Sequence, residues 1–149
     1  MEINKLIKEC SDFEWKAKYE EAKGFEKESK YVDAKRCYHS LIEGYESSYK
    51  ENPDDLGENK IYIESCYRAA LISARIGEFD DTKEMINKVI PLLYEIKDYE
   101  KISKLYYCLG NIEFNSNNKG LAYIYLSRAV TFNNMEKAYV GIKKIINNL

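Results

Sequence analysis

Three pairs of small residues constrain the fold of this chain more than any other feature, because each pair is separated by twelve positions. The pairs are Ala22 and Ala34, Ala70 and Thr82, and Gly110 and Ala122. Around each pair the apolar residues recur at helical spacing, and a turn signal lies between the two small residues. Because small side chains let two helices approach closely, the pattern predicts three antiparallel helix hairpins. Such hairpins stack into curved scaffolds that bind other chains.

The composition is typical of a water-soluble helical protein. Of its 149 residues 45% are hydrophobic and 32% are charged, and only two are prolines. No apolar run approaches the roughly 18 residues that a membrane-spanning helix requires. The first residues have no long apolar stretch behind them, so we expect a cytoplasmic protein without a secretory signal. A net charge of −2 does not favour nucleic acid or an anionic membrane as a partner.

The helical periodicity and its interruptions predict an all-α fold in a single domain, 1–149. We expect hairpins over about 12–50, 56–97 and 98–132, followed by a helix over about 134–148. This last helix has one apolar stripe, which is typical of a helix that covers the end of a stack.

Three local signals predict where helices begin, end or bend. Ser11 and Glu14 form the pattern of a capping box, which favours a helix break just before residue 12 over the alternative of one long helix. Pro91 interrupts an apolar run, so we expect it to kink or split its helix. Asp98 is a suitable N-cap for the helix that follows it.

The three copies resemble the tetratricopeptide repeat family, whose unit is a helix hairpin. The nearest copy carries, in order, Tyr106, Leu109, Gly110, Ala122, Leu126 and Ala129. The copies cover about residues 15–132. They depart from the family because they are separated by 48 and 40 residues rather than about 34, and because Ser73 and Glu113 replace its tyrosine. The resemblance implies a right-handed stack of three antiparallel hairpins with a C-terminal capping helix. It also implies a concave face that binds peptides.

The resemblance places candidate peptide-binding residues on the first helix of each hairpin. The position three residues before the first small residue is a tyrosine in every copy. The full candidate set is Lys16, Tyr19, Lys23, Tyr67, Leu71, Arg75, Lys104, Tyr107 and Asn111. The alternatives are that the tyrosines pack between hairpins and that the cations are simply solvated. The set does not reproduce the clamp by which some members of the family hold the acidic tails of heat-shock chaperones.

Neither catalysis nor a metal or cofactor site is expected. His39 is the only histidine and has no acidic neighbour in the sequence. The four cysteines lie far apart at apolar helical positions, which predicts buried free thiols rather than metal ligands or disulfides. They are Cys10, Cys37, Cys66 and Cys108.

We therefore expect a TPR-like adaptor that binds a protein or peptide segment and has no enzymatic activity. One alternative is a self-associating structural module whose terminal segments, 1–12 and 134–149, dock onto a second copy or onto a larger host chain. Another is a fragment-like relative of the bacterial peptide-pheromone receptors, which resemble degenerate repeats of this type.

Overall fold

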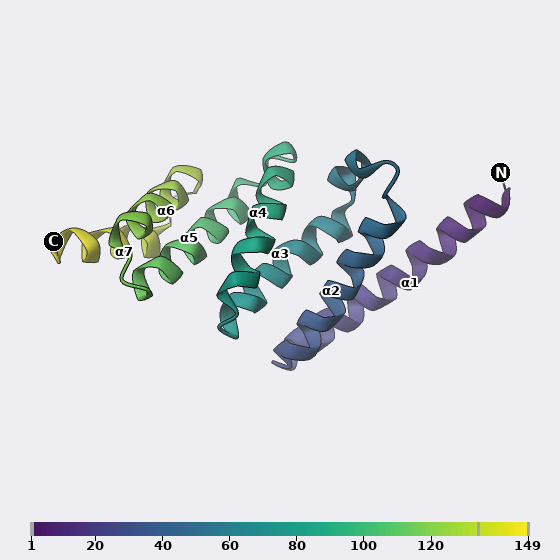
Figure 1. Cartoon of the computed structure of the whole chain (residues 1–149), viewed down its shortest axis with the longest axis horizontal. Helices are drawn as coiled ribbons and strands as arrows, with labels where there is room; N and C mark the ends of the chain where they lie inside the picture. The colour runs from purple at the N-terminus through teal and green to yellow at the C-terminus, as the bar shows by residue number, and fades with distance from the viewer. Residues whose placement is uncertain (1, 134, 149) are drawn as a thin grey trace. The chain divides into compact units, whose positions relative to one another are not determined.

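The computed structural model describes the backbone of residues 2–133 and 135–148, and the side chains of Ile3 and of residues 13–148 apart from 134. All the regular structure in these ranges is helical, which confirms the predicted all-α class (Figure 1). The helices are α1 (Glu2–Lys27), α2 (Tyr31–Ser48), the 3-10 helix η1 (Pro53–Glu58), α3 (Lys60–Arg75), α4 (Phe79–Glu95), α5 (Tyr99–Asn115), α6 (Lys119–Phe132) and α7 (Glu136–Asn147). None of them is long and apolar enough to cross a membrane.

The chain divides into two compact units, 1–72 and 73–149. In the first unit α1 and α2 pack together as a hairpin, and their small residues Ala22 and Ala34 are fully buried. The core beside them is aromatic, because the ring of Tyr45 lies 4.2 Å from that of Trp15 and 6.2 Å from that of Tyr62. Burial of several large rings supplies much of the hydrophobic stabilisation of this unit.

A polar network links the three α-helices of the first unit. The Arg68 guanidinium on α3 contacts the carboxylates of Glu26 on α1 and Glu64 on its own helix, at 3.1 and 3.0 Å. The hydroxyl of Tyr38 on α2 donates a hydrogen bond to Glu26 at 3.0 Å. Burial, together with the nearby Glu26 carboxylate, raises the pKa of Tyr38 well above its usual range, so the hydroxyl keeps the proton that it donates.

In the second unit α5 packs against α4 and α6, and α6 packs against α7. The hydroxyl of Ser103 on α5 donates a hydrogen bond of 2.6 Å to the carbonyl of Ala129 on α6. Toward α4, the buried carboxylate of Glu113 on α5 pairs with Lys83 at 3.1 Å. The helix α5 is therefore fixed to both α4 and α6 by polar contacts.

Four connections between consecutive helices share one backbone geometry. In each, one residue has a positive φ, as in the Schellman motif that ends many helices. These residues are Ser29 (φ 60°), Gly77 (φ 83°), Lys97 (φ 58°) and Asn117 (φ 61°). In the turn at Lys97, the Lys97 N–H donates a hydrogen bond to the Tyr94 carbonyl at 3.1 Å, and the Asp98 N–H donates one to the Leu93 carbonyl at 3.0 Å. The same pair of bonds closes the other three turns.

These turns account for the regular spacing in the sequence. In the three predicted hairpins, the second small residue stands five positions after the residue with positive φ and is fully buried. These second residues are Ala34, Thr82 and Ala122. A turn of fixed length therefore determines where the next helix first contacts its neighbour.

Replacing Lys97 with glycine is expected to raise the free energy of unfolding by about 0.5–1 kcal/mol, because glycine adopts a positive φ without steric cost. The gain is smaller than the full strain, since glycine also increases the conformational entropy of the unfolded chain. Urea denaturation followed by circular dichroism measures it. The matched variant Gly77→Ala introduces a Cβ at the same turn position and should lose stability; a loss in both variants would contradict the argument.

The capping prediction at Asp98 is confirmed, because its side chain accepts a hydrogen bond from the Lys101 N–H at 3.2 Å. Burial alone raises the pKa of Asp98, but the hydrogen bonds and charge of Lys101 outweigh it, so the pKa lies below its ordinary value.

The predicted helix break before residue 12 is wrong. The helix α1 continues through Ser11, because this segment has no glycine or proline and contains many strong helix formers. Of the two outcomes expected at Pro91, a kink or a split, the split does not occur, because α4 continues through this residue. Pro91 is exposed, so water can satisfy the carbonyl that loses its helical partner.

Candidate functional site

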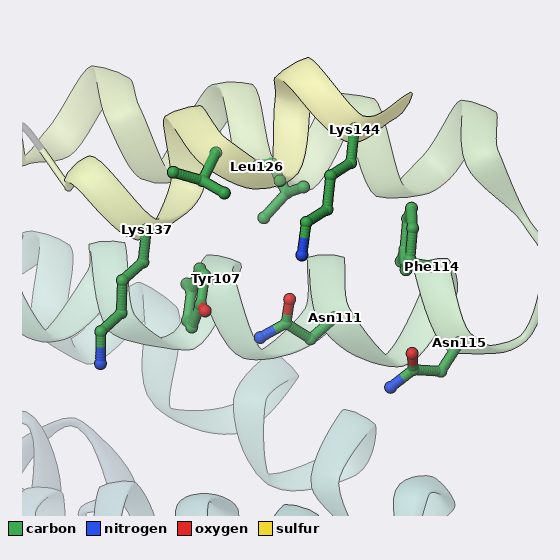
Figure 2. Close-up of a pocket in the computed structure, with 9 residues that line it drawn as sticks. Tyr107, Asn111, Phe114, Asn115, Leu126, Lys137 and Lys144 are labelled. Carbon is green, nitrogen blue, oxygen red and sulfur yellow. The ribbon is translucent and has the colours of Figure 1, made fainter. Parts of the chain in front are cut away.

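A pocket of about 330 Å³ opens in the second unit, between α5 and α7 with α6 at its base (Figure 2). Its walls come from one face of each outer helix, since the lining residues on α5 and on α7 follow helical spacing. The lining residues are Tyr107, Asn111, Phe114 and Asn115 of α5, Leu126 of α6, and Lys137, Val140, Gly141 and Lys144 of α7. The site therefore lies wholly within one compact unit.

Leu126 forms the base of the pocket and packs between two glycines. A Cβ added to Gly110 on α5 would lie 2.7 Å from Leu126 Cγ, and one added to Gly141 on α7 would lie 2.9 Å from its Cδ1. The Leu126 side chain is 1% exposed. The two glycines thus let α5 and α7 approach α6 closely, and the pocket has a tightly packed base.

The polar residues that line the pocket are Tyr107, Asn111, Asn115, Lys137 and Lys144, and none of them is acidic. Among the residues that the structure describes, no carboxylate lies within ion-pair distance of Lys137 or Lys144. Ion pairs in this unit include those of Lys83, Lys101 and Lys104. The pocket therefore offers two ammonium groups and two amides beside an apolar base, which suits a ligand with both anionic and apolar groups.

The structure brings two of the predicted site residues into this pocket, namely Tyr107 and Asn111. Lys104 lies on the same helix, but its ammonium pairs with Glu100 at 3.2 Å on the surface. Arg75, at the end of α3, is exposed. The face of α5 selected by the small-residue register is thus the face that lines the pocket.

The remaining predicted residues belong to the first unit and are placed differently from one another. The half-buried Tyr19 contacts the Tyr38 ring edge to face at 6.2 Å, and the ammonium of Lys23 lies 5.0 Å from the Tyr19 ring centroid. Tyr67 is buried at 7% exposure, Leu71 is half-buried and Lys16 is exposed. Within this unit the tyrosines therefore serve mainly as packing residues.

The α7 wall of the pocket was not predicted from the sequence. No role was predicted for Lys137 or Lys144 on the last helix. A usable signal was present, because Lys137, Val140, Gly141 and Lys144 follow the spacing of a single helix face with a glycine at its centre.

None of the described thiols forms a disulfide; Cys66 is buried as predicted, whereas Cys37 and Cys108 are half-buried. Cys10 lies outside the described side chains. Burial raises the pKa of Cys108 to about 11, so this thiol stays protonated near neutral pH. No group of three or more metal-binding side chains gathers among the described residues.

Comparison with models of protein families, with curated proteins and with solved structures finds no match to this chain.

Proposed function

We propose that this chain is a tetratricopeptide-like adaptor that binds a segment of another protein in the pocket between α5 and α7. The proposal includes the right-handed stack of three hairpins and the capping role of α7 that the sequence resemblance implies. It assigns the chain no catalytic step of its own.

One observation carries the proposal: the pocket combines hydrogen-bond donors that have no acidic partner with a firmly packed apolar base. Tyrosine and asparagine side chains make adaptable contacts with peptides at modest entropic cost. The repeated turn geometry gives independent support, because identical helix connections are typical of repeat proteins that bind extended segments.

The experiment is selection of random peptides on the full chain, followed by affinity measurements on a pocket-filling variant. Val140 lines the pocket and is 48% exposed, so Val140→Trp should fill the cavity without disturbing the core. We expect the selected peptides to bind this variant at least about tenfold more weakly, a loss of about 1.4 kcal/mol. The matched control is Ile146→Trp on the same helix, because Ile146 is 52% exposed and lies outside the pocket.

Equal affinity for both variants, or failure to select any peptide, would contradict this proposal. Sedimentation velocity of the full chain without peptide should come first. The large side chains of Ile3 and Phe13 are 72% and 76% exposed on α1, so a dimer disrupted by Phe13→Asp would favour the self-association alternative instead.

A further inference from the structure

We propose that the occupant of the pocket is an extended peptide segment with two acidic residues three positions apart and an apolar residue between them. This inference rests on the proposed peptide-binding function and specifies the chemistry of the partner. It follows from the positions of two lysines on α7 and from the residues that lie between and opposite them.

The positive charge of the pocket favours an anionic partner. Lys137 and Lys144 both contribute to the lining, and no aspartate or glutamate does. When a cationic site meets an anionic segment, the attraction speeds association. Partners of like charge are repelled, so binding is also more specific. An acidic segment supplies the carboxylates that the pocket lining does not provide.

The distance between the two lysines indicates how far apart the two acidic residues of the peptide should be. Lys137 and Lys144 are seven residues apart on α7, which is about 10.5 Å along a helix axis. In a polyproline II segment, residues three apart lie about 9 Å from each other on the same face. In Figure 2 the two amino groups lie at separate places along the pocket rather than converging on one point. They therefore suit two anionic groups better than a single terminal carboxylate.

The apolar surface between the two lysines favours a peptide with an apolar residue between its two acidic residues. Val140 lies between them on α7, and Leu126 and Phe114 complete the apolar surface. On the opposite wall the amides of Asn111 and Asn115 can each donate to and accept from a peptide backbone. The pocket thus has groups for the two acids, for the side chain between them and for the backbone.

The test uses a labelled peptide, N-acetylated and C-amidated, with the core Glu-Leu-Pro-Glu flanked by Gly-Ser repeats. Fluorescence polarisation measures its affinity for the full chain at low and moderate salt. We expect binding that weakens as salt rises, since the contacts are partly exposed ion pairs. A peptide with Gln in place of both Glu, and one with an extra glycine between the acids, should each bind at least about fivefold more weakly.

The protein variants are Lys137→Gln and Lys144→Gln, with Lys143→Gln as the matched control because Lys143 carries the same charge on α7 but does not line the pocket. Each pocket variant should weaken binding about fivefold, and the control less than about twofold. Equal losses in all three variants, insensitivity to acid spacing, or no binding below about 1 mM would overturn the inference.

The outcome separates this inference from the proposed function. If selected peptides lack the acid pair but still lose affinity with Val140→Trp, the pocket binds peptides and only the inferred motif is wrong. If a free C-terminal carboxylate proves necessary for binding, the site holds one terminal anion and the two-acid arrangement is wrong.

Discussion

Replacing Leu126 with alanine is expected to lower the free energy of unfolding by about 3–4 kcal/mol, among the largest effects of a single substitution in this chain. The side chain is 1% exposed and fills the space between Gly110 and Gly141, so its removal leaves a cavity that the packed helices cannot easily close. Urea denaturation measures the loss. Leu121→Ala on the same helix is the matched control, since Leu121 is 39% exposed and should lose less than about 1 kcal/mol.

A double-mutant cycle tests whether the glycines and Leu126 fit together as described. Gly110→Ala alone should cost about 1–2 kcal/mol, because overpacking against Leu126 exceeds the gain in helix propensity. In the Gly110→Ala background, Leu126→Ala should cost at least about 1 kcal/mol less than in the wild type, since the added methyl then occupies part of the cavity. Strict additivity would show that Gly110 does not contact Leu126.

Replacing Arg68 with alanine is expected to lower the free energy of unfolding by about 2–3 kcal/mol, because the change leaves two partly buried carboxylates without their cation. Glu26 and Glu64 both contact this guanidinium and are mostly shielded from water. Arg68→Lys should recover only part of the loss, since lysine cannot reproduce the planar fork that contacts both acids. Chemical denaturation measures both variants.

Arg36→Ala is the control for the loss of an arginine charge. Arg36 pairs with Asp33 at 3.7 Å on the surface, and its side chain is 77% exposed. Such pairs contribute about 0–1 kcal/mol, so this variant should remain close to the wild type. If the two arginine variants lose stability equally, the network that links α1, α2 and α3 is not a major source of stability.

The sequence predicted the helices well where periodicity and turns agree. Ala22, Ala34, Ala70, Thr82 and Ala122 are fully buried at the positions that the spacing indicated. The break at Ser11 was wrong because a capping pattern competes with the propensity of the residues around it, and here the propensity prevails. A motif of a few residues does not reveal that balance.

The candidate site was predicted only in part, because a pocket forms between helices and periodicity assigns residues to the faces of one helix at a time. Tyr107 and Asn111 were found since they lie on a face that the small-residue register defines. Lys144 was missed because the apolar stripe of α7 does not reveal which neighbouring helix it meets. Tyr67 has the same register as Tyr107 but is buried, since what covers a side chain is not encoded in its own helix.

The four Schellman turns have a consequence for how such a chain can diverge. Each turn is closed by main-chain hydrogen bonds, and glycine, serine, lysine and asparagine all occupy the position with positive φ. A duplicated hairpin can therefore change the residue at this position at a modest energetic cost and still keep its connection. Ancestry among such hairpins would then be better preserved in main-chain bonding than in residue identity.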